Sequence, residues 1–181
     1  MPKNDRIDKE SWYVEIAKVV AMCSTYIMTE VNANRVSIDQ YYMKIADVVS
    51  MRSTCLRHKF GCVIVKDDQI ISTGYNGAVR HALHCLDVGC IRDRMNIPSG
   101  TMIEICEAVH AEQNALLQAG RFAKKGTLYI NGTPCKTCSK MIVNSRIKKV
   151  VVPTKDNYPD KNGISLLRKM DIDIVEIEYF K

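Results

Sequence analysis

The sequence contains no long hydrophobic run, no internal repeat and no low-complexity segment in its 181 residues. No apolar stretch approaches the roughly 20 residues that cross a bilayer, which argues against a membrane-spanning protein. The opening residues MPKNDRIDKE have charges of both signs and no apolar core, so we expect no signal peptide and a cytoplasmic location. The composition, 46% apolar and 25% charged, excludes a disordered or fibrous chain.

Acidic residues are absent between Gln113 and Lys155, although this stretch contains nine basic residues. The formal net charge of the whole chain is +6 at pH 7. A basic stretch suits an anionic partner, either nucleic acid or a small phosphate, and a solvated surface explains it equally well. Only Phe122 and Tyr129 supply aromatic rings there, so stacking on nucleic-acid bases has little support.

Histidine is scarce, with four residues, whereas cysteine is abundant, with eight. An even number of cysteines is typical of disulfide frameworks, but these occur mostly in secreted chains shorter than about 100 residues. We therefore expect reduced thiols, some of which bind a metal. The cysteines are Cys23, Cys55, Cys62, Cys85, Cys90, Cys106, Cys135 and Cys138.

Hydrophobic periodicity predicts helices that alternate with strands. Ser37 and Gln40 fit a capping box at the start of one helix, and Asp67-Asp68 separates two strands that form a hairpin. Alternation of this kind predicts a layered α/β domain around a single sheet. We expect helices at 11–34, 102–119 and 165–170, and two more helices that begin at Ser37 and at Pro134. We expect strands at 60–66, 69–74, 127–131, 148–152 and 172–177.

Residues 75–101 contain glycines, a proline and few periodic apolar residues, which predicts a long loop. A loop of this length is too long to be structureless, so something should hold it in place. No linker divides the chain into two domains. We treat residues 1–36 as an N-terminal helical extension and residues 37–181 as the functional domain.

Two short motifs carry the chemistry: His110-Ala-Glu112, and Pro134-Cys-Lys-Thr-Cys138, which begins 22 residues after Glu112. A C-x-x-C sequence that opens a helix places both sulfurs on one face. With His110 as third ligand, a tetrahedral zinc ion keeps its fourth position open, which is typical of catalytic rather than structural sites. The alternative is that Cys135 and Cys138 form a redox pair or a structural site, with His110 in the core.

Glu112 would lie beside that open position without binding the metal. The combination H-x-E…P-C-x-x-C is the general signature of zinc-dependent deaminases. It predicts hydrolytic deamination of a cytosine-type ring by zinc-activated water, with Glu112 as the proton shuttle. Ala111, a small residue between the two, would leave room for the ring.

Beyond the zinc motif, the chain resembles the deoxycytidylate (dCMP) deaminases of the cytidine-deaminase superfamily. The resemblance covers about residues 40–180 and rests on Arg52-Ser-Thr-Cys55, Gly61-Cys-Val-Ile-Val-Lys-Asp67, Ile70-Ile-Ser-Thr-Gly-Tyr-Asn-Gly77 and His110-Ala-Glu-Gln-Asn-Ala115. The segment His84-Cys-Leu-Asp-Val-Gly-Cys-Ile-Arg92 resembles bacterial and archaeal members in particular. It implies a three-layer α/β/α fold with a mixed five-stranded sheet, to which this chain adds an N-terminal helix. It also implies a hydrolase that converts dCMP to dUMP and ammonia in pyrimidine nucleotide biosynthesis. Such enzymes usually assemble as hexamers, and many are allosteric, activated by dCTP, with Mg²⁺ as its companion ion, and inhibited by dTTP.

The resemblance also assigns roles to single residues. It implies that Asn76 contacts the nucleotide, that Arg121 lies near the phosphate and that Tyr158 packs on the base. Each has a plainer interpretation, as a turn residue, an exposed loop arginine and a loop aromatic respectively.

A second, structural zinc ion is a further implication of the resemblance. Cys55 and Cys85 match two of its ligands, and Cys90 and Cys106 are the natural remaining ones, with His84 as an alternative. A closed site of four ligands would hold the long loop in place. Alternatively, some of these thiols are simply buried apolar groups.

Two other functions stay open from the sequence. One is a different deaminase, acting on tRNA adenosine, on single-stranded DNA cytosine or on a free nucleoside, because all share the zinc motif. The other is a zinc-stabilised, non-enzymatic protein that binds nucleic acid through residues 121–155. The second alternative gives Glu112 no role.

Overall fold

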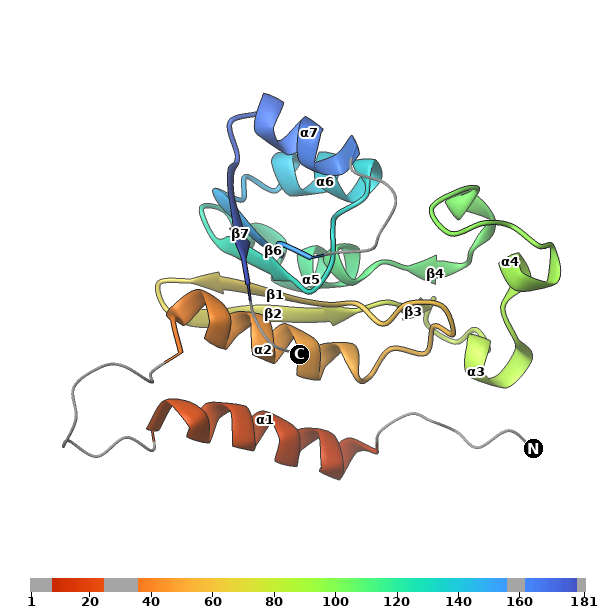
Figure 1. The fold of residues 1–181 in the computed structure, drawn as a ribbon, viewed down its shortest axis with the longest axis horizontal. Coiled ribbons are helices and arrows are strands. Elements are labelled where there is room, and N and C mark those ends of the chain that lie inside the picture. The colour runs from red at the N-terminus through yellow and green to blue at the C-terminus, as the bar shows by residue number, and fades with distance from the viewer. Residues whose placement is uncertain (1–7, 25–35, 156–161, 179–181) are drawn as a thin grey trace.

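A computed structural model describes residues 8–24, 36–155 and 162–178 of the chain (Figure 1). Tyr158 lies outside these residues, and the side chain of Cys23 is not described. None of the helices in the described ranges is long and apolar enough to cross a membrane.

A mixed sheet of five strands forms the centre of the fold, in the order β2-β1-β5-β6-β7. Antiparallel pairs join β1 to β2 and β1 to β5, whereas β5, β6 and β7 run parallel. The mixed five-stranded sheet is therefore confirmed. The strands are β1 (Gly61–Lys66), β2 (Gln69–Tyr75), β5 (Thr127–Ile130), β6 (Lys149–Pro153) and β7 (Asp173–Ile177).

Helices cover both faces of this sheet, as Figure 1 shows. Successive side chains of a strand point to opposite faces, so Cys62 and Ile64 pack in one core cluster while Val63 and Val65 pack in the other. The first cluster lies under α5 (Ala111–Ala119), α6 (Lys136–Asn144) and α7 (Asn162–Lys169). The second lies under α2 (Ile38–Ser50), with α1 (Lys9–Ser24) on its outer side. The three-layer α/β/α fold is confirmed.

The predicted capping box is present at the start of α2. The Ser37 hydroxyl accepts from the backbone N–H of Gln40, and the Gln40 side chain accepts from the backbone N–H of Ser37. The hairpin of β1 and β2 is also confirmed, and Asp67 and Asp68 in its turn both have positive φ.

The expected long loop at 75–101 is not structureless. It contains β3 (Gly77–Ala78) and two short helices, α3 (Cys85–Val88) and α4 (Ile91–Arg94). The apolar residues of these short elements do not repeat over enough turns to give a periodic pattern, which is why the sequence did not predict them.

The helix expected at 102–119 is wrong in its first half. Residues 103–105 form a single 3₁₀ turn, Ala108–Val109 is strand β4, and the helix α5 begins at Ala111. Strand β4 pairs with β3, about 30 residues away, so a long-range ladder replaces the local helical bonds that the pattern suggested.

Two glycines allow very close packing around α5 and α6. A Cβ atom on Gly74 of β2 would collide with the backbone of Ala111 and Ala115 in α5. A Cβ atom on Gly163 of α7 would collide with the carbonyl oxygen of Pro134, just before α6. The N-terminal turns of α5 and α6 are therefore held by direct backbone contact with neighbouring elements.

Candidate active site

His110 occupies the N-cap position immediately before α5. Its backbone is extended, with φ −72° and ψ 156°, and its N–H donates to the side chain of Gln113 at 2.9 Å. Because Gln113 is the third residue of the helix, this bond fixes how the chain enters it. The imidazole is thereby held at the N-terminal end of α5.

Cys135 and Cys138 are placed by the start of α6. Cys135 is the N-cap residue, and its Sγ accepts from the backbone N–H of Cys138 at 3.5 Å. Both cysteines are buried, and Pro134 precedes them on the short connection from β5. The end of β5 thus delivers both thiols to the same side of the sheet as His110.

The three candidate ligand atoms lie close together. Nδ1 of His110 is 3.6 Å from Sγ of Cys135 and 3.4 Å from Sγ of Cys138. Among the described residues, this is the one group of three or more potential metal ligands whose donor atoms all lie within 4.8 Å of one another. Nitrogen and sulfur ligands of a tetrahedral zinc ion are about 3.5 Å apart. These three residues therefore fit a shared zinc ion with a fourth position left for water.

Glu112 lies in the first turn of α5 and is only 3% exposed. Burial raises the pKa of its carboxyl group, and the nearby His110 opposes this when it is charged. A carboxyl group works best as a general acid and base when its pKa is close to the working pH. A raised pKa brings a carboxyl group closer to that condition near neutral pH. Glu112 has the environment that a proton shuttle needs.

The Cys135 thiolate is stabilised by its surroundings. Its pKa is lowered to about 4 by the hydrogen bond from the Cys138 side chain, with a further contribution from His110, although burial acts in the opposite direction. The same contact, together with burial, raises the pKa of Cys138. Zinc binds thiolates, so metal binding would displace the proton from Cys138.

A pocket of about 750 Å³, including its open mouth, lies over this group. His110, Glu112 and Cys135 line one part of it, and Asn76 and Thr133 line the wall nearby. Two of the three candidate metal ligands, His110 and Cys135, and the candidate proton shuttle Glu112 therefore face one open space.

Cys55, Cys85, Cys90 and Cys106 line another part of the same pocket. Burial raises the pKa of Cys85, and the other three thiols raise it further, so the four lie near one another. Within the described residues, however, no three of them bring their sulfur atoms within 4.8 Å of one another. The four thiols line the same part of the pocket, but their sulfur atoms are not arranged to bind one metal ion. The second zinc ion stays a prediction. His84, the alternative ligand, caps α3 and does not line the pocket.

Asn76 lines the pocket, but its amide already holds the backbone of a neighbouring segment. Oδ1 accepts from the N–H of Phe60 at 2.8 Å, and Nδ2 donates to the carbonyl oxygen of His58 at 2.8 Å. Asn76 is 7% exposed. Its clearest role in the structure is to fix the pocket wall at residues 58–60.

The other residues to which a substrate role was assigned lie elsewhere. Ala111 is fully buried and does not line the pocket. Arg121 is exposed in a 3₁₀ turn, η2 (Gly120–Ala123), where its guanidinium lies 5.0 Å from the ring centre of Phe122. It also lies outside the pocket lining. Tyr158 is outside the described residues.

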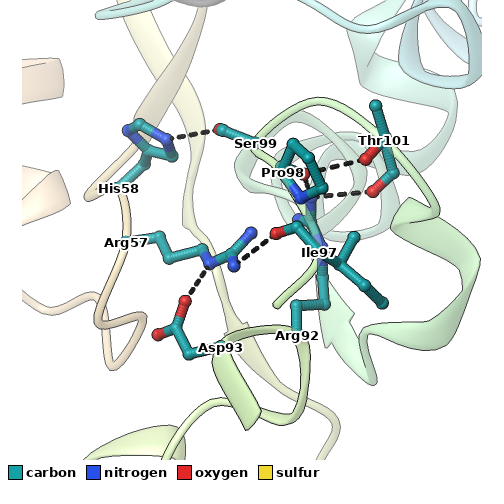
Figure 2. A network of polar contacts seen from close by, with 8 residues as sticks. All are labelled: Arg57, His58, Arg92, Asp93, Ile97, Pro98, Ser99 and Thr101. Atoms are coloured by element: carbon teal, nitrogen blue, oxygen red, sulfur yellow. Dashed lines mark hydrogen bonds and ion pairs between the residues drawn. The ribbon is translucent and has the colours of Figure 1, made fainter. Parts of the chain in front are cut away.

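Arg57 lines the pocket and was not singled out by any sequence motif. Its Nε donates to Asp93 at 2.6 Å and its Nη2 to the carbonyl oxygen of Ile97 at 2.6 Å. Beside it, Nε2 of His58 lies 2.8 Å from the hydroxyl of Ser99. Figure 2 shows how these contacts tie the end of the long loop to the segment before β1. They supply the restraint that a loop of this length requires.

Arg92 is a second pocket-lining arginine, at the end of the segment 84–92 that resembles the family, and it was given no role of its own. It is 9% exposed, and its Nη2 donates to the carbonyl oxygens of Pro98 and Thr101, each at 2.8 Å (Figure 2). Arg57 belongs to no motif, and the motif that ends at Arg92 does not give that residue a role. Only the folded arrangement of the loop brings them to the pocket.

Sequence comparison identifies relatives of this chain. The family model described as "Cytidine and deoxycytidylate deaminase zinc-binding region" matches residues 36–154. Deoxycytidylate deaminase of Saccharomyces cerevisiae is 37% identical over 127 residues, which cover 69% of this chain and 40% of that protein. The enzyme of the same name from Schizosaccharomyces pombe is 39% identical over 122 residues, covering 66% and 38% respectively. The chain thus spans about two fifths of the length of these relatives.

Structure comparison gives the same fold. A crystal structure of dCMP deaminase from the cyanophage S-TIM5, in complex with dCMP and dUMP, superposes with a TM-score of 0.63 at 29% identity. The match covers 77% of this chain and 96% of the phage chain.

Proposed function

Because this chain belongs to the cytidine and deoxycytidylate deaminase family, we propose that it hydrolyses dCMP to dUMP and ammonia with zinc as cofactor. One observation carries the proposal. His110, Cys135 and Cys138 bring their donor atoms within 4.8 Å of one another, and the buried carboxyl group of Glu112 faces the same pocket. The names of the yeast relatives and the nucleotides bound to the phage enzyme support dCMP as the substrate.

Each residue has a definable part in this reaction. His110, Cys135 and Cys138 would hold the zinc ion, which when bound polarises a water molecule and makes it a better nucleophile. Glu112 accepts a proton from the attacking water and passes it to the ring nitrogen next to the amino-bearing carbon. Glu112 then takes the remaining proton from the oxygen now bonded to the ring carbon and delivers it to the amino group, which leaves as ammonia when the carbon–nitrogen bond breaks. Water and dCMP are consumed, and dUMP and ammonia are formed.

Several finer features are proposed on the resemblance alone. They are hexameric assembly, activation by dCTP with Mg²⁺, inhibition by dTTP, and nucleotide contacts by Asn76, Arg121 and Tyr158. A cytoplasmic location and room for the ring at Ala111 are proposed from the sequence itself. The division into an extension at 1–36 and a deaminase domain at 37–181 is also a proposal. The match of the family model from residue 36 onward supports it.

Turnover of purified protein tests the main proposal. The chain is assayed against dCMP, deoxycytidine, dCTP, tRNA and single-stranded DNA oligonucleotides, with ammonia release and ultraviolet absorbance as readouts. We expect dCMP to be the preferred substrate. Preference for a nucleic acid would establish one of the alternative deaminases.

The variant Glu112→Gln provides the matched control. It keeps the size of the side chain and removes the ability to shuttle protons, so we expect turnover to fall by about 10²–10⁴-fold while zinc remains bound. Turnover near the wild-type rate in this variant would contradict the mechanism. Salt-dependent nucleic-acid binding without any deamination would instead support the non-enzymatic alternative.

A further inference from the structure

Asn131 follows the last residue of β5 and is 4% exposed, and it does not line the pocket. Its amide makes two hydrogen bonds to other elements. Oδ1 accepts from the N–H of Gly61, the first residue of β1, at 2.9 Å, and Nδ2 donates to Oδ1 of Asp47 in α2 at 2.9 Å. The backbone N–H of Asn131 also donates to the carbonyl oxygen of Gly61 at 3.3 Å. Asn131 therefore joins three elements at one buried point.

The elements that Asn131 joins to β5 are packed closely against each other. A Cβ atom on Gly61 would collide with the carbonyl oxygen of Ala46 in α2, so the first residue of β1 lies directly against the backbone of that helix. Helix α2 covers the face of the sheet opposite to α6 (Figure 1). The amide of Asn131 thus ties the end of β5 to a closely packed part of the fold, on the other side of the sheet from the helix that begins with the candidate thiol ligands.

The connection from Asn131 to the candidate zinc ligands is short. Residues 132–134 lead directly from Asn131 to Cys135, the N-cap of α6. A Cβ atom on Gly132 would collide with the ring of Phe60, so the chain passes directly over this pocket-lining ring. Because each residue has only two soft backbone dihedral angles, so short a connection has little capacity to absorb a displacement of its first residue. A shift of Asn131 would therefore reach Cys135.

We propose that Asn131 is a positioning residue for the reaction. Its amide holds residues 132–134 so that Sγ of Cys135 stays near its 3.6 Å separation from Nδ1 of His110. This rests on the proposed function, because Cys135 and His110 would hold the zinc ion that activates the water. Asn131 does not line the pocket, so it acts through the connection that it anchors. Displacements of this kind, far from the reacting atoms, cost large factors in rate.

The variant Asn131→Ala tests the assignment, with Tyr129→Phe as matched control. Tyr129 belongs to β5, does not line the pocket, and also donates a hydrogen bond to an aspartate of α2, Asp39. Both variants lose contact between this strand and α2, but only Asn131→Ala releases the connection to Cys135. In Asn131→Ala we expect kcat for dCMP per zinc-loaded chain to fall by about 10–10²-fold, with KM changed less than about threefold. Tyr129→Phe should keep both wild-type values.

Cobalt(II) in place of zinc gives a readout that a merely structural role would not change. The visible absorption of cobalt bound to thiolates and imidazole depends on the geometry of its ligands. We expect Asn131→Ala to alter this spectrum and to weaken zinc binding by about 10–100-fold in competition with a chelator, whereas Tyr129→Phe matches the wild type. Wild-type kcat and cobalt spectra in both variants, with stability lowered in both, would overturn the proposal, because Asn131 would then serve only the fold.

Exchanging the two hydrogen-bond partners provides a rescue, and it replaces Asn131→Ala if that variant does not fold by circular dichroism. Asn131→Asp keeps an acceptor for the N–H of Gly61 but places two carboxyl groups against each other, so kcat should fall. Adding Asp47→Asn restores a donor opposite an acceptor and should restore kcat and the cobalt spectrum. A double variant as impaired as Asn131→Asp alone would overturn the proposal, because this hydrogen bond would not be what positions Cys135.

The metal-binding measurements require no turnover, so this proposal and the proposed function fail separately. If the wild-type chain deaminates nothing, but Asn131→Ala changes the cobalt spectrum and Tyr129→Phe does not, the proposed function fails while the positioning role stands. If the wild type deaminates dCMP and Asn131→Ala matches it in kcat and in the cobalt spectrum, only the positioning role fails.

Discussion

The indole N–H of Trp12 in α1 donates a hydrogen bond of 3.0 Å to the carbonyl oxygen of Val48 in the last turn of α2. Trp12 and Val19 also pack against the core cluster on this face of the sheet. The N-terminal helix, for which the resemblance offered no counterpart, is thus attached to the domain by a specific contact.

Replacing Trp12 by Phe should lower the free energy of unfolding by about 1–2 kcal/mol, because the ring remains apolar but the hydrogen bond is lost. Urea unfolding followed by circular dichroism measures this, since Trp12 is the only tryptophan and fluorescence would be lost with it. The control Val14→Ala, at a position 54% exposed on the same helix, should be nearly neutral. Equal effects of the two variants would contradict the attachment.

The environment of Tyr129 leads to a prediction for the free energy of unfolding at alkaline pH. Its hydroxyl donates to Asp39 at 2.8 Å, and Lys149 binds the same carboxylate at 2.8 Å. Burial, and then the bond to Asp39, raise the pKa of Tyr129 well above its ordinary value of 10.0. Above pH 10 the folded state therefore keeps a proton that the unfolded state has lost. Unfolding free energy should fall by up to about 1.4 kcal/mol per pH unit from this group.

Tyr129→Phe should remove that part of the pH dependence, at a cost of about 1 kcal/mol at pH 8 for the lost hydrogen bond. Urea titrations at pH 8 and above pH 10 give the comparison. Tyr13→Phe, at a position 54% exposed, serves as control and should keep the wild-type slope. An unchanged slope in Tyr129→Phe would refute the assignment.

Asn76→Asp distinguishes a structural role from a purely substrate-binding one. The variant keeps an acceptor for the N–H of Phe60 and loses the donor to the carbonyl oxygen of His58. We expect a loss of about 1–3 kcal/mol of stability in the free protein, together with a raised KM. Thermal denaturation without ligand measures the first effect, and Asn144→Asp at an exposed position is the control. Unchanged stability would mean that Asn76 acts only on the substrate.

Zinc content tests the metal ligands directly. Cys138→Ser should lower the zinc content by one ion per chain and abolish turnover, because two ligands hold zinc much less tightly than three. The melting temperature should fall as well, since metal binding contributes to folding. Retention of all zinc in Cys138→Ser would contradict the site. Cys85→Ser tests the second zinc ion. A zinc content one ion per chain below that of the wild type supports a second site, and an unchanged zinc content argues against it.

Local signals predicted the parts of the fold that are local. The Ser37–Gln40 capping box, the turn at Asp67-Asp68 and the helix that opens at Cys135 all depend on residues a few positions apart. The start of α5 could not be found in this way, because Ala108–Val109 is fixed by pairing with β3 rather than by its own periodicity. The spacing of the apolar residues before His110 therefore led to the prediction of a helix that begins too early.

Some residues of the candidate site could likewise be predicted from local motifs, and others could not. His110, Glu112, Cys135 and Cys138 were predicted because zinc chemistry demands particular residue types at particular spacings. Arg57 and Arg92 carry no such spacing, and arginine is common on surfaces. What distinguishes them is burial with an unpartnered nitrogen, a property that exists only once the long loop has folded against the segment before β1.

Gly74 and Gly163 have a consequence for how variants of this chain would be interpreted. Neither lines the pocket, yet each approaches the backbone at or just before the start of a helix that carries Glu112 or Cys138. A methyl group at either position would shift that helix and separate groups that must stay within hydrogen-bonding or ligand distance. A genetic screen for lost activity would then recover these two positions beside the zinc ligands, although no chemistry takes place at either of them.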